Sequence, residues 1–253
     1  MASKICHIME TMKDDIIVHP GRGVREKSIP ECGLLLVNPT EARNCSRILI
    51  DRGGEQRFLF HSDLVVSPGS DFFVAGPSVG APMAAMVLEK LIALGARTVV
   101  MAGWCGAVDP VISVGDTVLG GLAHPGEGTS RYYSDSTVLQ PSSWLLKNLQ
   151  AVLNTQAPVP VWSTDAPYRE SRSMLSSLSR QYGVAVVDME YSALCAVASH
   201  RGVDFAALFL TSDELWKKEW YPGFNGKVFK RKSKAQLKLL MNSIVTLSRY
   251  KEK

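Results

Sequence analysis

The sequence predicts a single α/β domain, and three features carry this prediction. Two apolar runs of four to six residues, Val184–Val187 and Phe205–Leu210, each end in acidic residues, which is typical of buried strands in parallel sheets. The segment between them, Tyr191–Gly202, has helical periodicity and a terminal glycine. A length of 253 residues, with 46% hydrophobic and 21% charged residues, suits one globular domain.

The remaining elements are expected in the following order. Residues 1–32 are polar and irregular and predict an N-terminal arm, so the domain is expected to span residues 33–253. A first buried strand is predicted at Gly33–Val37, followed by an exit loop at Asn38–Arg43 and then a helix that ends at Asp51. Further strands are predicted at Gln56–Phe60, Leu64–Val66, Phe72–Ala75, Thr98–Ala102, Val114–Leu119 and Pro158–Trp162, and helices at Met83–Leu94, at Trp144–Asn154 and from about Lys230. A turn is expected at Gly103–Gly106, directly after the strand Thr98–Ala102.

Two acids are expected to meet at one end of the sheet. Glu190 follows the first apolar run and Asp213 follows the second. Ligands of parallel sheets bind beyond the carboxyl ends of the strands, so these side chains suit a binding carboxylate and a general acid. Acids at strand ends also cap the next helix, and spacing alone leaves both interpretations open. The glycine loop Gly76–Pro82 would let a ligand approach the backbone closely.

Composition argues against several other classes of protein. No apolar run approaches the roughly 20 residues of a membrane span, and the N-terminus lacks the apolar core of a signal peptide. Five cysteines without a CxxC pair indicate reduced thiols and no metal cluster. We therefore expect a cytoplasmic protein. The glycine loop lacks the dinucleotide spacing, which argues against a nicotinamide or flavin cofactor.

The net charge of +4 is unevenly distributed. From Trp216 onward there are eleven lysines or arginines and two acids, a balance of +9. A basic tail can bind nucleic acid or an acidic membrane. However, the apolar residues of this tail have helical spacing, so we expect the solvated face of a packed terminal helix, with neither nucleic acid nor membrane as a partner. These apolar residues are Leu237, Leu240, Met241, Ile244 and Leu247.

The motifs VVDMEYSAL (residues 186–194), LTSDEL (210–215) and GWCG (103–106) resemble those of the purine nucleoside phosphorylase and uridine phosphorylase family, which includes nucleosidases. The resemblance covers roughly residues 33–215. It implies a three-layer αβα fold whose mixed central sheet is partly curled into a barrel. It also implies a nucleoside substrate, no cofactor other than inorganic phosphate as a possible co-substrate, and a homo-oligomer of two to six subunits.

The resemblance also implies roles for individual residues. Met189 and Glu190 would hold the ribose, with Met189 on the sugar face and Glu190 on the hydroxyls. Asp213 would protonate or hydrogen-bond N7 of a purine, which the uridine branch of the family does not do. Tyr168 and Val187 would sandwich the base. Arg169 would be placed to contact a base carbonyl, which keeps uridine open as a substrate.

The region that would hold phosphate or water departs from the family pattern. It comprises Gly80, Gly103 and the positions where the family carries two arginines and a serine or threonine, which here are Glu41, Met101 and Trp104. Replacing arginine by these side chains removes charge-assisted hydrogen bonds to an anion.

Three explanations of this departure stay open. The protein is a phosphorylase that binds phosphate through Arg43, Arg22 or an arginine of a neighbouring subunit. Alternatively, it is a nucleosidase in which Glu41 activates a water. As a third possibility, it binds nucleosides without cleaving them. Phosphorolysis of a purine nucleoside to free base and ribose 1-phosphate is the leading prediction, and no metal is required.

Overall fold

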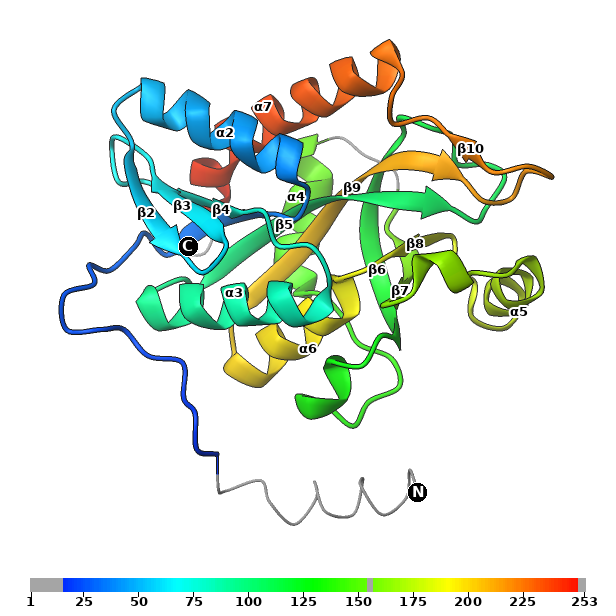
Figure 1. Cartoon of the computed structure of the whole chain (residues 1–253), viewed down its shortest axis with the longest axis horizontal. Coiled ribbons are helices and arrows are strands. Elements are labelled where there is room, and N and C mark those ends of the chain that lie inside the picture. Colours follow the sequence, from blue (N-terminus) through cyan, green and yellow to red (C-terminus); the bar gives the residue numbers. More distant parts are fainter. Residues whose placement is uncertain (1–15, 154–156, 250–253) are drawn as a thin grey trace.

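The computed structural model describes residues 16–153 and 157–249, which form one mixed α/β domain (Figure 1). The first fifteen residues of the predicted arm, including Cys6, and Asn154 at the end of a predicted helix lie outside the described residues. The strands are β1 (Cys32–Leu36), β2 (Glu55–Leu59), β3 (Ser62–Val66), β4 (Phe73–Gly76), β5 (Thr98–Ala107), β6 (Thr117–Gly126), β7 (Val159–Thr164), β8 (Val186–Asp188), β9 (Asp204–Glu214) and β10 (Tyr221–Pro222).

The ten strands form one sheet, which closes partly into a barrel. Their order is β10-β9-β6-β7-β8-β5-β1-β4-β3-β2, and β9 also pairs with β5. This extra pairing closes a ring of five strands, β5, β8, β7, β6 and β9, from which β1 to β4 extend as an open sheet. The predicted fold class is therefore confirmed.

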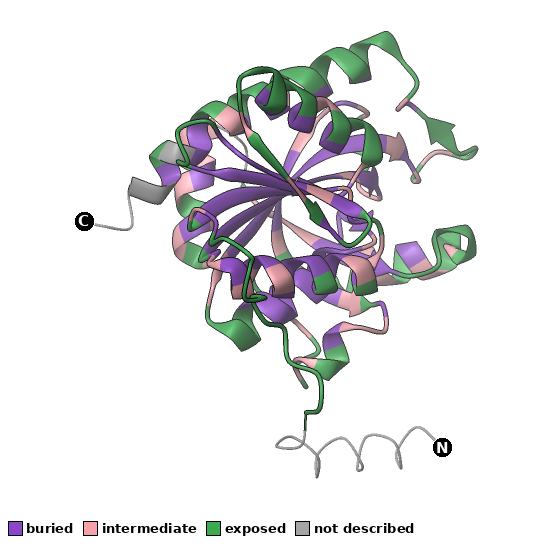
Figure 2. Ribbon diagram, turned by 60° about the vertical axis from the view of Figure 1, so that its left-hand side comes forward, coloured by how far each residue is buried: buried purple, intermediate pink, exposed green. Residues whose placement is uncertain are grey.

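Helices cover both faces of the sheet and complete three layers. They are α2 (Pro39–Asp51), α3 (Ala81–Leu94), α4 (Ser143–Leu153), α5 (Arg172–Tyr182), α6 (Tyr191–Arg201) and α7 (Lys227–Arg249), with short 3-10 turns η1 (Ser130–Tyr132) and η2 (Pro167–Arg169). One core cluster joins the sheet to α3 and α6, and a second joins it to α2, α4 and α7. Figure 2 shows the strands buried between helices whose outer faces are exposed.

The amphipathic pattern of the tail is confirmed by α7. Leu237, Leu240, Ile244 and Leu247 are buried in the second cluster. Burying such a side chain stabilises a fold by about 1.5–3 kcal/mol. Helix α7 is thus a structural layer whose lysines and arginines lie mainly on the exposed face. None of the helices in the described ranges is long and apolar enough to cross a membrane.

The arm is exposed from residue 16 to residue 28, and Ile29 is its first buried side chain. Lys90 in α3 holds it, since its Nζ lies 2.7 Å from the carbonyl oxygen of Gly21 and 2.5 Å from a carboxylate oxygen of Glu26. The four described cysteines are buried and unbridged. The boundary predicted after residue 32 remains a prediction.

The strand directions differ from the simple parallel arrangement expected for residues 184–187 and 205–210. Strand β9 runs parallel to β5, whereas β8 runs antiparallel to it. The GWCG segment, expected as a turn, continues β5 because it pairs with strands on both sides. Gly106 pairs with Val187 of β8 and Asp213 of β9, so these two residues flank one position of the barrel.

Candidate active site

A cavity of about 510 Å³ opens where β5, β8 and β9 meet. It is lined by most of the residues predicted to hold ribose and base, namely Tyr168, Val187, Met189, Glu190 and Asp213, and by Trp104 of the predicted phosphate or water region. The other residues that line it are Val37, Asn38, Val79, Cys105, Gly106, Pro167, Glu170, Arg172, Leu175, Asp188, Ser212, Leu215 and Trp220. Residues from distant parts of the chain therefore converge on one space large enough for a small ligand.

Glu190 is held at the start of α6 by backbone groups. Its carboxylate Oε1 accepts a hydrogen bond of 2.6 Å from the backbone N–H of Gly80, the residue that precedes α3. Gly80 has a φ of +87°, a conformation that favours glycine. Gly80, predicted in the phosphate or water region, thus positions the Glu190 carboxylate.

Asp188, two residues before Glu190, caps the start of α6. Its Oδ2 accepts hydrogen bonds from the backbone N–H groups of Glu190 and Tyr191, at 3.0 and 2.7 Å. Its Oδ1 accepts a 2.5 Å hydrogen bond from the hydroxyl of Ser163. The sequence left open whether an acid at this strand end caps the next helix or binds a ligand. In the structure Asp188 caps α6, and Glu190, two residues later, lines the cavity.

Burial disfavours negative charge on both acids. Only 4% of Glu190 and 6% of Asp188 is exposed. Desolvation raises the pKa of Glu190, and the nearby Asp188 carboxylate raises it further. The pKa of Asp188 is also raised by burial, against the effect of its hydrogen bonds. A buried carboxyl with a raised pKa at a cavity wall is typical of a functional site.

Asp213 lines the same cavity, near the end of β9. Its Oδ2 accepts a 2.8 Å hydrogen bond from the indole N–H of Trp220, and its Oδ1 lies 2.6 Å from the hydroxyl of Ser212. A side chain at Gly106 would crowd this wall, because a Cβ there would lie 3.3 Å from Asp213 Oδ2 and 2.9 Å from the side chain of Leu215. Glycine at 106 thus leaves room beside Asp213.

Glu170 lines the cavity and was missed as a site residue by the sequence analysis. Burial and the neighbouring Asp213 raise its pKa to about 7. The only signal in the sequence was its place two residues after Tyr168. Tyr168 itself is fully exposed at the rim, and Arg169 is exposed and does not line the cavity.

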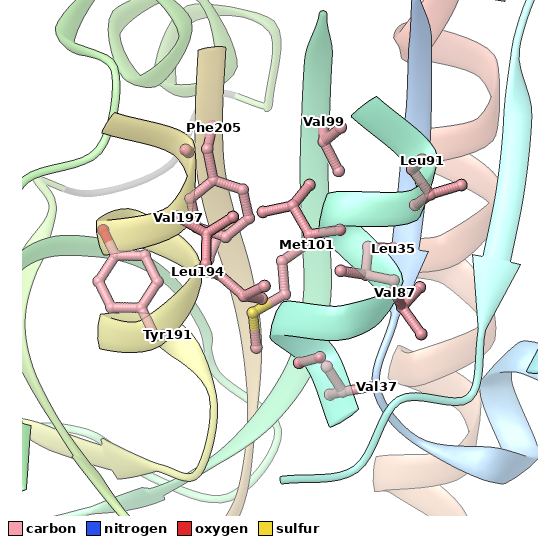
Figure 3. Close-up of a cluster of buried hydrophobic side chains, with 14 of the residues drawn as sticks. Leu35, Val37, Val87, Leu91, Val99, Met101, Tyr191, Leu194, Val197 and Phe205 are labelled. Atoms are coloured by element: carbon pink, nitrogen blue, oxygen red, sulfur yellow. The ribbon is translucent and has the colours of Figure 1, made fainter. Parts of the chain in front are cut away.

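The wall expected to bind phosphate or water is apolar. Met101 is fully buried in the first core cluster, where Figure 3 shows it among Leu35, Val37 and Leu194. Gly103 packs tightly, because a Cβ there would lie 2.8 Å from the side chain of Val37. Both residues therefore serve packing in this structure, and neither lines the cavity.

Trp104 closes this wall with aromatic contacts. Its ring stacks on Phe224 at 5.9 Å between centroids and meets the edge of Phe229, at the start of α7, at 5.0 Å. Its indole N–H is buried without a hydrogen-bond partner among the described residues.

Glu41, Arg43 and Arg22 do not line the cavity. Glu41 is buried against α7, where its Oε1 accepts a 2.7 Å hydrogen bond from the hydroxyl of Ser233. Arg43 is exposed on α2 and donates to the carbonyl of Pro39, within its own helix. Arg22 is exposed in the arm. In this single chain, the residues predicted to activate water (Glu41) or to bind phosphate (Arg43 and Arg22) thus lie outside the cavity.

One cationic side chain, Arg172, lines the cavity within the described ranges. Its guanidinium donates to the backbone carbonyls of Lys217 and Lys218, so two of its nitrogen atoms already have partners. Acids outnumber it, since Glu170, Asp188, Glu190 and Asp213 line the same space. No group of three or more metal-ligating side chains is present in the part of the chain that the structure describes.

The family model of the phosphorylase superfamily matches residues 34–244. The chain belongs to this superfamily. A guanosine phosphorylase of Halorubrum lacusprofundi is 27% identical over 145 residues, which cover 55% of this chain and 60% of that protein. The chain thus spans less than two thirds of the length of this curated relative.

Solved structures of the phosphorylase superfamily share the fold. A purine nucleoside phosphorylase from Toxoplasma gondii, in complex with immucillin-H, superposes with a TM-score of 0.77 at 19% identity, covering 94% of this chain and 99% of that chain. An AMP nucleosidase from Bacteroides thetaiotaomicron superposes with a TM-score of 0.72 at 19% identity, covering 89% and 91%. At these identities the likeness concerns the fold.

Proposed function

We propose that this protein cleaves the N-glycosidic bond of a purine nucleoside and transfers the ribose to inorganic phosphate. The observation that carries the proposal is that Met189, Glu190 and Asp213 line one cavity. The similarity to a guanosine phosphorylase supports a purine substrate and a phosphorolytic reaction.

Each step has a residue of this chain to support it. Glu190 accepts hydrogen bonds from the ribose hydroxyls, and Met189 packs against the sugar, while Val187 and Tyr168 flank the base. As the bond between C1′ and N9 breaks, its electron pair goes to the base, and Asp213 gives a proton to N7. A phosphate oxygen forms the new bond to C1′, which has oxocarbenium character in the transition state. The products are free base and ribose 1-phosphate.

Hydrolysis is the second candidate, favoured by the acidic lining of the cavity. Four carboxyl groups and one arginine, which is already bonded to two carbonyls, oppose the binding of an anion. The fold of the AMP nucleosidase shows that the architecture also accommodates a nucleosidase. In this form of the proposal, water replaces phosphate and the other roles are unchanged.

Base release from inosine, guanosine, adenosine and uridine, measured with and without phosphate, tests the proposal. We expect release from purine nucleosides that requires phosphate. Asp213→Asn should lower kcat/KM by about 10²–10⁴-fold, whereas Asp51→Asn on the exposed end of α2 should leave it unchanged. Release without phosphate would replace phosphorolysis by hydrolysis. Binding without any release would leave a nucleoside-binding protein. Assembly into a homo-oligomer and a cytoplasmic location remain predictions.

A further inference from the structure

A buried acid outside the cavity, Glu127, has no role in the reaction proposed above. It directly follows β6, and only 9% of it is exposed. The N–H groups of Thr129 and Ser130 and the hydroxyl of Ser130 donate to it from its own loop. The hydroxyl of Ser192 donates a further 2.8 Å hydrogen bond to its Oε1 from the first turn of α6. Glu127 therefore connects the end of β6 to the helix that begins directly after Glu190.

The start of α6 is held by side chains of other elements. Glu190, its N-cap residue, makes no side-chain capping hydrogen bond. The backbone N–H groups of Glu190 and Tyr191 donate to Asp188 instead. The N–H of Ser192 donates a 2.9 Å hydrogen bond to Oγ of Ser163, whose hydroxyl in turn donates to Asp188. These contacts come from β7 and β8, whereas the contact to the Ser192 side chain comes from the end of β6.

The three anchors of this helix start lie at one edge of the barrel. Strands β6 and β7 run parallel, as do β7 and β8, so Glu127, Ser163 and Asp188 lie near the carboxyl ends of three neighbouring strands. Ser163 and Ser192 are fully buried. A hydrogen bond lost between such groups is not replaced by one to bulk water. Because Glu190 directly precedes the anchored turn, its carboxyl group follows any movement of that turn.

We propose that Glu127 is a positioning residue, which acts through Ser192 to hold the first turn of α6 so that the Glu190 carboxyl group is aligned with the ribose hydroxyls. The inference rests on the proposed function, because it takes Glu190 as the acceptor for the ribose. The N–H of Gly80 holds one carboxyl oxygen of Glu190, but the backbone that carries this side chain is set by the helix start. Hydrogen bonds weaken steeply as their angle departs from linear, so a small rotation of α6 is enough to weaken recognition of the sugar.

Glu127 also holds its own loop, and that role alone predicts a different result. Its bonds to Thr129 and Ser130 fix the segment that contains η1. A loss of folding stability lowers activity toward every nucleoside alike, because it reduces the amount of folded enzyme. A loss of alignment at Glu190 lowers activity most for substrates that offer it the most hydroxyls. Two nucleosides that differ by one ribose hydroxyl therefore separate the two roles.

The ratio of kcat/KM for inosine to kcat/KM for 2′-deoxyinosine, measured with phosphate present, tests the proposal. Ser192→Ala removes the hydroxyl that donates to Glu127 and keeps the N–H that donates to Ser163. We expect this variant to lower the ratio by about three- to tenfold, since hydrogen bonds between Glu190 and the ribose are weakened. An unchanged ratio, with both values reduced equally, would overturn the proposal.

Glu127→Gln, alone and combined with Ser192→Ala, tests whether Glu127 acts through Ser192. The single variant should lower the ratio, because an amide is a weaker acceptor than a carboxyl group that receives four donors from its surroundings. In the Ser192→Ala background it should change the ratio no further. An equal decrease in both backgrounds would show that Glu127 acts by another route, and would overturn the proposal.

Ser130→Ala is the matched control. It removes a buried hydroxyl that donates to the same oxygen of Glu127, but from η1. This hydroxyl also lies 3.4 Å from that of Ser192, which keeps its own bond to Glu127. We expect the ratio for Ser130→Ala to stay within about twofold of the wild type. A decrease as large as that in Ser192→Ala would contradict the role assigned to the contact with α6.

Two outcomes for the wild type separate this inference from the proposed function. A wild-type ratio near one would refute the ribose role of Glu190 and this inference together. If the wild type releases no base from either nucleoside, the proposed cleavage fails, and calorimetric titration with the same two nucleosides replaces the kinetics. Ser192→Ala should then lower the preference for inosine in Kd by the same factor of about three to ten. An unchanged preference would overturn the inference, and a lowered one would support it without catalysis.

Discussion

Replacing Glu190 by glutamine should stabilise the fold while it impairs the site. The folded protein raises the pKa of Glu190 above its ordinary 4.5, through burial and the Asp188 charge. At pH values above 4.5 the native state therefore keeps a proton that the unfolded chain releases. Stability then falls as pH rises, because the native state binds more protons than the unfolded state. Glutamine carries no charge and keeps an oxygen for the N–H of Gly80.

The size of this effect follows from the thermodynamic link between proton binding and folding stability. Each pH unit over which the native side chain keeps the extra proton costs about 1.4 kcal/mol. Hydrogen bonds to the carboxylate from the backbone N–H groups of Gly80 and Met189 reduce the effect. Each such unit should raise the melting temperature of Glu190→Gln above that of the wild type by about 3–6 °C, so the variant gains most at pH 7.5 and little at pH 4.5.

Urea unfolding at pH 4.5 and 7.5 measures this difference directly. The control is Glu31→Gln, an exposed carboxyl before β1, which should change stability equally little at both pH values. The same Glu190 variant should lose about 100-fold or more in kcat/KM, because an amide NH₂ group replaces a carboxyl oxygen that accepts from the ribose hydroxyls. If Glu190→Gln were no more stable at pH 7.5 than the wild type, burial of the Glu190 carboxyl group would not lower the stability of the fold at that pH. That result would refute the reasoning.

Three further predictions concern the other walls. Glu170→Gln removes a carboxyl group whose pKa burial and Asp213 raise to about 7, so a transition of kcat/KM near pH 7 should disappear in the variant; a transition that persists would contradict this. Glu41→Gln should change phosphate-dependent base release by no more than about threefold, since its carboxylate bonds to Ser233 outside the cavity; a loss above 100-fold would restore the water-activating role. Trp104→Ala removes a large, partly buried ring that contacts two other aromatic rings, so it should lower the free energy of unfolding in urea by about 3 kcal/mol. An unchanged urea midpoint would count against the packing role of Trp104.

That most of the residues proposed to hold ribose and base share one cavity could be predicted because they lie in short contiguous motifs. Met189 and Glu190 directly follow a buried strand, and Asp213 lies near the end of another, so local sequence fixes their place at the strand ends. The terminal helix could be predicted for a similar reason, since the spacing of its apolar residues determines which face is buried. These features depend on few contacts with the rest of the chain.

The missed features depend on contacts between distant segments. Closure of the barrel, which only the family resemblance implied, cannot be read from the period of β9 or β5. Glu170 lies near Asp213 on a loop, where side-chain spacing has no fixed period. Gly103–Gly106 resembled a turn because two glycines in four residues favour turns, yet close packing against Val37 and Leu215 requires these glycines within a strand.

The two halves of the site are held by different parts of the fold, and this explains how one could change without the other. Glu190 is anchored by the backbone N–H of Gly80 before α3, and Asp213 by the end of β9 and by Trp220. Neither depends on the side chain at position 101 or 104. An arginine at 101 would be buried in the core cluster, where a charge without a partner is costly, so methionine there fits the surrounding apolar residues. With Trp104 packed against the start of α7, β5 of this chain provides no cation for an anionic acceptor. Any phosphate that reacts in this cavity must therefore be held by groups outside that wall.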